Sequence, residues 1–106
     1  ERGWVAEIDG EIVGSVLLVK KSARIAKLRL LLVEPHARGL GIGRKLVAAC
    51  IAFAKAAGYE RITLWTQSTL VAARRVYEQA GFRLKHEEAH KSFGHDLIAQ
   101  TWELAL

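Results

Sequence analysis

The chain of 106 residues has a single cysteine, Cys50, so it cannot form an intramolecular disulfide. Cys50 lies within an apolar stretch, residues 47–53. Buried free cysteines usually behave as small apolar side chains, and a nucleophilic thiol needs a polar, electropositive environment. We therefore predict a buried, inert thiol at Cys50.

Long apolar runs are also missing, and the chain does not open with a charged segment followed by an apolar one. We therefore expect no transmembrane helix, no signal peptide, no membrane partner and a cytoplasmic location. With 51% hydrophobic and 25% charged residues, the composition is typical of a compact domain. We expect one domain over residues 1–106.

A continuous basic block is absent as well. Lysine and arginine total 16 against 11 acidic residues, a net charge of +5, which favours anionic partners without identifying them. The basic residues fall in dispersed pairs, and neither a recognition helix nor an aromatic platform for nucleic acid is evident. We expect no direct nucleic-acid binding by this domain.

The first half of the chain predicts three strands and a helix. Alternating apolar residues at 4–8 and 12–19 flank Asp9-Gly10, a pair typical of tight hairpins. A third strand, Ala26–Val33, ends before Pro35, because proline cannot continue a ladder. Apolar residues then recur at spacings of three and four from Ile42 to a terminal Gly58, which predicts an amphipathic helix.

The second half predicts a strand at 61–66, a second helix over 70–80 and a closing hairpin. We expect Ser68 or Thr69 to cap this helix and Gly81 to end it. The helix carries an apolar face made of Leu70, Ala73, Val76, Tyr77 and Ala80. The last strands are expected at 82–90 and 97–104, around residues 92–96. The class is α/β, with three antiparallel strands first and a right-handed parallel crossover over residues 28–66.

A glycine-rich turn, Arg38-Gly39-Leu40-Gly41-Ile42-Gly43, lies between the third strand and the first helix. Small residues let an anion approach the backbone, and the first helical turn offers unpaired N–H groups and the positive end of the helix dipole. Neither the P-loop spacing nor the dinucleotide spacing fits, since Gly43 is followed by Arg44-Lys45-Leu46. The remaining pattern is Arg-x-x-Gly-x-Gly.

This pattern, with Val33-Glu34-Pro35 before it, resembles the pyrophosphate loop of the GNAT superfamily of N-acetyltransferases. A second family signature, Ala-x-x-x-Tyr-x-x-x-Gly-Phe, is matched by residues 73–82. The resemblance implies a mixed, mainly antiparallel sheet with two helices. The family's opening strand and helices have no counterpart here, so we expect an N-terminally truncated domain. Residues 90–104 resemble the acetyltransferase half of bacterial fusions to MarR-type regulators.

The resemblance also implies acetyl-CoA as cosubstrate, an amine of a small molecule or peptide as acceptor, and a possible homodimer. The backbone of Leu31, Leu32 and Val33 would pair with pantetheine, and amides near Val33 would polarise the thioester carbonyl. The pyrophosphate would be held by Arg38, Gly39, Leu40, Gly41, Ile42, Gly43 and Arg44.

Catalytic roles follow from the same resemblance. Tyr77 would donate a proton to the CoA sulfur. The general base stays open between Glu34, His36 and a water relay. Many relatives carry asparagine where this chain has Leu70, so Gln67, Ser68 or Thr69 is an alternative cofactor contact.

Two other interpretations compete with this one. His86-Glu87-Glu88-Ala89-His90 spells the zinc-protease pattern, which requires a helix; on the strand expected here the two histidines lie too far apart to share one metal. We therefore predict no metal site. The domain could also be a sensor that binds acyl-CoA for an attached regulator without turnover.

Overall fold

The computed structural model describes the backbone of residues 1–68, 70–92 and 95–106, and the side chains of these except 90–92 and 95–97. The elements, in chain order, are β1 (Arg2–Ile8), β2 (Glu11–Lys20), β3 (Ile25–Val33), the 3-10 turn η1 (Pro35–Ala37), α1 (Ile42–Ala56), β4 (Arg61–Gln67), α2 (Val71–Ala80), β5 (Arg83–Ser92) and β6 (His95–Ala105). The predicted order of strands and helices is confirmed, and η1 is an addition.

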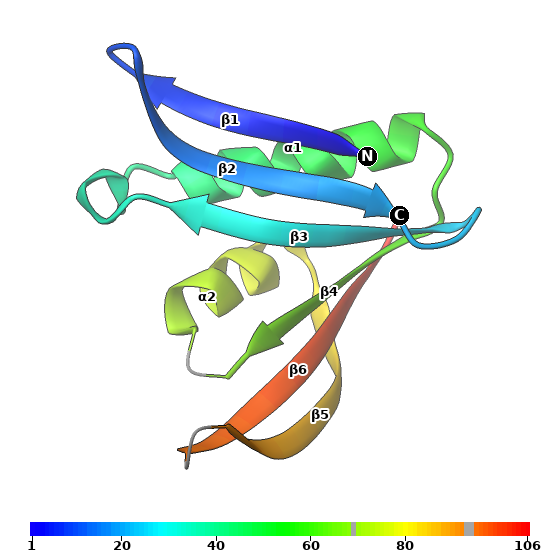
Figure 1. The fold of residues 1–106 in the computed structure, drawn as a ribbon. Helices are drawn as coiled ribbons and strands as arrows, with labels where there is room; N and C mark the ends of the chain where they lie inside the picture. Colours follow the sequence, from blue (N-terminus) through cyan, green and yellow to red (C-terminus); the bar gives the residue numbers. More distant parts are fainter. Residues whose placement is uncertain (69, 93–94) are drawn as a thin grey trace.

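The described strands form one six-stranded sheet in the order β1-β2-β3-β4-β6-β5 (Figure 1). The β3–β4 pair is parallel, and the other neighbouring pairs are antiparallel. The α/β class and the mixed, mainly antiparallel sheet with two helices are therefore confirmed. The parallel pair requires a crossover, and α1 provides it.

The β1–β2 hairpin turns at Asp9-Gly10 as predicted. Both residues have positive φ, 50° and 82°, which is the geometry of the two-residue turn that matches strand twist. Aspartate and glycine tolerate this region better than most residues. Local chemistry therefore set the position of this turn, and an irregularity between Ala6 and Glu7 shifts the register farther along the hairpin.

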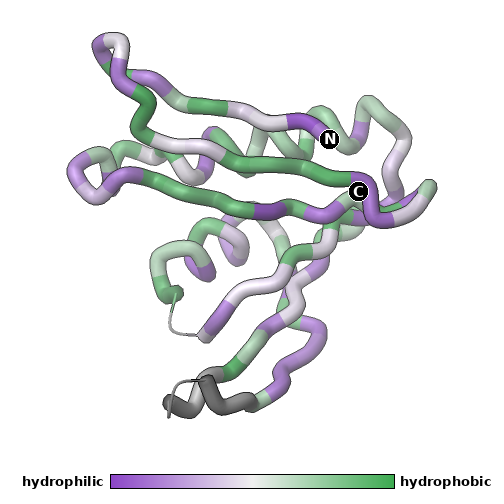
Figure 2. The backbone as a smooth tube through the Cα atoms, in the orientation of Figure 1, coloured by the Kyte–Doolittle hydropathy of each residue, from purple (hydrophilic) through white to green (hydrophobic). Residues whose placement is uncertain are grey.

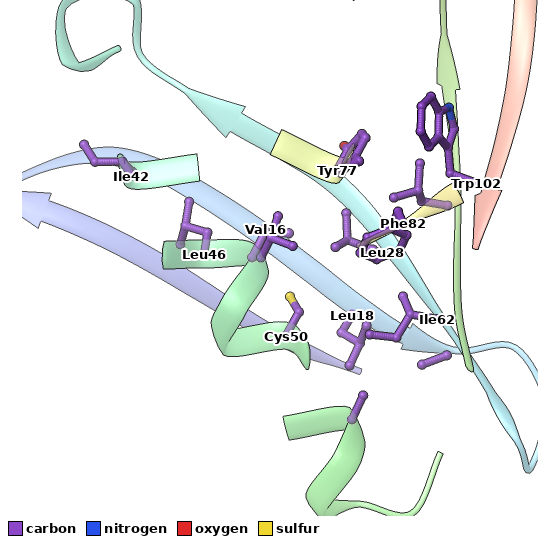
Figure 3. Close-up of a cluster of buried hydrophobic side chains, with 14 of the residues drawn as sticks. Val16, Leu18, Leu28, Ile42, Leu46, Cys50, Ile62, Tyr77, Phe82 and Trp102 are labelled. Atoms are coloured by element: carbon purple, nitrogen blue, oxygen red, sulfur yellow. The ribbon is translucent and has the colours of Figure 1, made fainter. Parts of the chain in front are cut away.

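The core lies between the sheet and the helices (Figure 3). Helix α1 contributes Ile42, Leu46, Val47, Cys50 and Ala54, with Cys50 fully buried. Burial raises the pKa of the Cys50 thiol to about 12. The predicted inert thiol fits this position. Figure 2 shows long apolar stretches along β2 and β3, which supply buried residues to the other side of this core.

The start of α2 differs from the prediction. Helix α2 begins at Val71 with Leu70 at the capping position, and no side chain caps it, so Ser68 does not serve as the cap. Leu70 is 52% exposed, so it does not belong to the buried face. Thr69 and residues 93–94, between β5 and β6, lie outside the described residues.

Within the described chain, no helix has the length and apolarity needed to cross a membrane.

Candidate functional site

The two parallel strands β3 and β4 part halfway along their length. Their last pair is Leu28 with Leu64, yet β3 continues to Val33 and β4 to Gln67 (Figure 1). Over residues 29–33, the backbone groups of β3 that face β4 have no strand partner, while the other edge of β3 stays paired with β2. An extended ligand can pair with such an edge as an added strand.

A bulge at Leu30 marks the place where the strands part. Leu30 has a positive φ of 55°, and the β2–β3 register shifts at the same level, with Leu17 opposite Arg29 and Ser15 opposite Leu32. The extra residue in β3 turns Leu31 and Val33 toward the core and leaves Leu32 63% exposed. Of the three residues predicted to meet pantetheine, the bulge therefore directs two inward and one outward.

The glycine-rich turn ends at a helix start with the geometry that an anion site requires. Gly41 precedes α1 in the left-handed region, φ 76°, and the first bond of the helix runs from the Lys45 N–H to the Gly41 carbonyl at 3.1 Å. The amides of Ile42, Gly43 and Arg44 therefore lack helical partners. The first turn holds no acidic residue, so the positive end of the helix dipole is uncompensated.

Gly43 has a packing role. A Cβ there would lie 3.4 Å from Val76 Cγ2 of α2 and 3.7 Å from Val33 Cγ2 of β3. Gly43 therefore lies where α1 approaches both α2 and β3, whereas a Cβ at Gly39 or Gly41 would meet nothing within 4 Å. The predicted turn thus divides into an open part, at Gly39 and Gly41, and a packed part, at Gly43.

The opposite side of the helix start depends on Gly14 of β2, which the sequence did not single out. A Cβ at Gly14 would lie 3.0 Å from Ile42 Cγ2, 3.1 Å from the Leu32 carbonyl oxygen and 3.2 Å from Leu46 Cδ1. Gly14 therefore lets the first turns of α1 lie close to β2 and β3. A glycine inside an otherwise apolar strand is the signal that could have revealed it.

Tyr77 lies in the core at 5% exposure, on α2 (Figure 3). Its ring centroid is 5.9 Å from that of Phe82. Burial, with a further contribution from nearby Cys50, raises the pKa of the Tyr77 phenol to about 12. The phenol therefore stays protonated at neutral pH.

The Gly81-Phe82 part of the second motif has a local explanation. Gly81 ends α2 with φ 100°, and the Phe82 N–H donates to the Tyr77 carbonyl at 3.0 Å. This is the hydrogen bond of a glycine-terminated helix, and it brings Phe82 back beneath Tyr77. The motif thus couples the end of the helix to the placement of the tyrosine.

The two candidate bases follow β3. Glu34 is exposed, and its N–H donates to the Val13 carbonyl at 2.8 Å, which fixes the backbone at the strand end. His36 in η1 lies with its Nε2 3.6 Å from a carboxylate oxygen of Glu11 in β2, and both side chains are exposed. Arg38 is exposed directly before the turn. The structure thus places Glu34 nearest the end of β3, and it pairs His36 with Glu11.

Arg44 contacts α2. Its Nε donates to Gln79 Oε1 at 2.7 Å, and both side chains are exposed. The two residues line one end of an open groove of about 780 Å³ between the helices. The remaining lining residues of this groove are Ala48, Ile51, Ala52, Lys55 and Ala80. Gln79 is a second residue that the sequence did not single out, because an exposed glutamine carries no pattern of its own.

A chain of polar side chains crosses the β5–β6 pair, from buried Trp102 and Gln100 to exposed Glu87. The Trp102 indole N–H donates to Gln100 Oε1 at 3.1 Å, and Gln100 Nε2 donates to Glu87 Oε1 at 3.0 Å. Gln100 is 2% exposed, so both ends of its amide are used. This row of hydrogen-bonded side chains lies beside Thr66, in the part of β4 that no longer pairs with β3.

Because His86 to His90 lies within β5, the helix that the zinc-protease pattern requires is not formed. The side chain of His90 is outside the described residues. Among the side chains that are described, no three of histidine, cysteine, aspartate or glutamate gather as a metal site would need.

Residues 1–82 match the Acetyltransferase (GNAT) family, and the chain belongs to this family. Over 81 residues it is 36% identical to N-acetylaspartate synthetase of Danio rerio, covering 76% of this chain and 29% of that protein. It is 35% identical over 100 residues to a Xenopus tropicalis protein named "probable N-acetyltransferase camello", covering 92% and 46%. The chain therefore spans less than half of these relatives.

Among solved structures, a Bacillus anthracis protein described as a streptothricin acetyltransferase, in complex with acetyl coenzyme A, superposes with a TM-score of 0.89. It is 28% identical, and the match covers 98% of this chain and 61% of that one. The predicted family is thereby confirmed on the level of both sequence and fold.

Proposed function

We propose that this chain is an N-acetyltransferase domain that moves the acetyl group of acetyl-CoA to an amine of a small molecule or peptide. One observation carries the proposal. The open edge of β3 leads directly to a helix start with three unpaired amides, so an extended arm and a pyrophosphate find adjacent partners. Acetyl-CoA has both parts.

The proposed cofactor contacts follow the chain. Backbone groups of Leu31, Leu32 and Val33 pair with the pantetheine arm. The turn from Arg38 to Arg44 holds the pyrophosphate through the unpaired amides at its end, with Gly39 and Gly41 leaving the approach open. The Arg38 N–H already donates to the Pro35 carbonyl at 3.3 Å, so Arg38 contributes its exposed side chain instead. When bound, acetyl-CoA supplies an activated acetyl group as a thioester.

Tyr77 is proposed to act on the sulfur. Transfer forms a C–N bond, breaks the C–S bond and moves one proton from the amine toward the thiolate. An ordinary thiol has a pKa near 8.5, so complete transfer from a phenol of pKa about 12 is uphill by about 5 kcal/mol. Tyr77 therefore stabilises the leaving sulfur by donating a hydrogen bond, and it keeps its own proton.

For the base we propose Glu34, because it lies at the end of β3 beside the turn. The backbone amides near Val33 are proposed to polarise the thioester carbonyl. A Glu34→Gln variant that keeps full activity from pH 6 to 9 would assign the proton to a water relay.

We further propose a cytoplasmic location, a homodimer and no direct nucleic-acid binding by this domain. Kinship with the acetyltransferase half of bacterial MarR-type fusions would make its origin bacterial. The sensor interpretation is not favoured, since the relatives are named as a synthetase and an acetyltransferase. Binding of acetyl-CoA without turnover would restore it.

The test begins with calorimetric titration of CoA and of NAD into the wild-type chain, Gly41→Glu and Gly43→Ala. We expect CoA to bind and NAD to bind far more weakly. Gly41→Glu places a negative charge in the amide nest and should abolish binding, whereas Gly43→Ala, whose Cβ points at Val76, should bind like wild type. Unchanged binding to Gly41→Glu would refute the site.

Turnover is then measured as thiol release with acetyl-CoA and a panel of amines. Aspartate belongs in the panel because one relative is named for its N-acetylated form. A peptide with a free N-terminus and a polyamine represent the other acceptor classes. Thiol release with one acceptor and loss of this release in Tyr77→Phe support the enzyme.

A further inference from the structure

The contact between Arg44 and Gln79 joins the anion site to the second helix. Arg44 has its amide in the unpaired first turn of α1, and its guanidinium reaches the last turn of α2. The Nε to Oε1 distance of 2.7 Å is short for an N–H···O bond, as expected when the donor is charged. Two residues 35 positions apart in the sequence are thereby fixed together.

The use of Nε decides what the rest of the guanidinium can do. An arginine has five N–H donors, and the Nε–H bond to Gln79 occupies one of them. The two terminal NH₂ groups remain and form the planar fork that suits phosphate oxygens. A guanidinium held by its Nε is therefore oriented before the ligand arrives, which lowers the entropy that binding would cost.

The groove beside Arg44 and Gln79 also suits a ligand that carries a phosphate. It starts at Arg44 and follows α1 past Ala48 and Ala52 to Lys55, about 16 Å for a rise of 1.5 Å per residue. Small apolar side chains form its floor, and a basic residue lies at each end. An anionic group attached to a flat apolar one fits this lining.

We propose that Gln79 is a positioning residue that holds Arg44 so that its terminal N–H groups meet a phosphate of CoA at the mouth of the groove. This inference rests on the proposed function, because it takes CoA as the ligand. The phosphate is either the pyrophosphate or the 3′-phosphate, and the two are separable by experiment.

The test uses Gln79→Met, which keeps the length of the side chain and removes the acceptor oxygen. Arg44→Lys keeps the charge but loses both Nε and the fork. Calorimetric titration with CoA should show about three- to tenfold weaker binding for each variant. The double variant should bind CoA no more weakly than Arg44→Lys alone, because both substitutions abolish the same Arg44–Gln79 contact. Arg75→Met, on the exposed part of α2 away from the groove, is the control, with less than a twofold change expected.

Dephospho-CoA distinguishes the two phosphates. If Gln79→Met weakens the binding of CoA but not that of dephospho-CoA, Arg44 contacts the 3′-phosphate. If it weakens the binding of both equally, Arg44 contacts the pyrophosphate. In turnover, Gln79→Met should raise the KM for acetyl-CoA and leave kcat unchanged, which a merely structural role would not produce.

Wild-type affinity in Gln79→Met, or additive losses in the double variant, would overturn the inference while leaving the proposed function intact. Failure of the wild-type chain to bind CoA would instead refute the proposed function itself.

Discussion

The two glycines of the turn should respond in opposite ways to the same substitution. Gly41 has φ 76° and open space around it, so Gly41→Ala suffers the left-handed penalty of about 1 kcal/mol or more. Gly43 lies in the helix, and its added Cβ would make ordinary contacts of 3.4 Å and longer. Gly43→Ala should therefore gain about 0.5 kcal/mol from helix propensity.

Both substitutions lower the conformational entropy of the unfolded chain equally. This entropic contribution to stability therefore cancels when the two variants are compared. The expected difference in unfolding free energy is about 1.5 kcal/mol or more, or a separation in Tm of about 7 °C or more for a domain of this size. Thermal unfolding followed by circular dichroism measures it. Gly43→Val, which forces bulk against Val76, should lose about 1–3 kcal/mol and serves as the control.

Equal Tm values for Gly41→Ala and Gly43→Ala would refute this assignment of an open and a packed glycine. Loss of CoA binding in Gly43→Ala would refute it too, because the added methyl group points at Val76 and Val33 and away from the unpaired amides.

Three further predictions concern the core and Tyr77. Gly14→Ala should lose about 1–3 kcal/mol in urea unfolding, because its Cβ meets the Leu32 carbonyl at 3.1 Å; the neighbouring Ser15→Ala should lose little. Tyr77→Phe should lower kcat about 10- to 100-fold with an unchanged KM for acetyl-CoA, and an unchanged kcat would remove Tyr77 from the mechanism. Burial raises the pKa of Cys50 and Tyr77 to about 12, so stability is full below pH 9 and falls as pH rises toward 12. Cys50→Ala should remove the decline between pH 9 and 10, as pH-dependent thermal unfolding would show.

At several places where local chemistry decides the conformation, the sequence alone predicted it. Asp9-Gly10 formed the turn of the first hairpin, and Gly81 ended α2. Strand β3 ended at Val33, two residues before Pro35. Periodicity predicted the buried face of α1, since residues three and four apart share one side of a helix. The Arg-x-x-Gly-x-Gly spacing located the helix start that we propose as the anion site, because unpaired amides are a local property of a helix start.

Tertiary structure decided what depends on distant neighbours. Leu70 fits the helical pattern but is 52% exposed, because α2 begins one residue later and Leu70 stands at the capping position. The bulge at Leu30, the close approach at Gly14 and the Arg44–Gln79 bond each join residues far apart in the chain. Their energies arise only when the sheet and both helices are in place. The sequence thus determined where the helix start and its unpaired amides lie, and the packing of α1 against β2, β3 and α2 decided which side chains surround them.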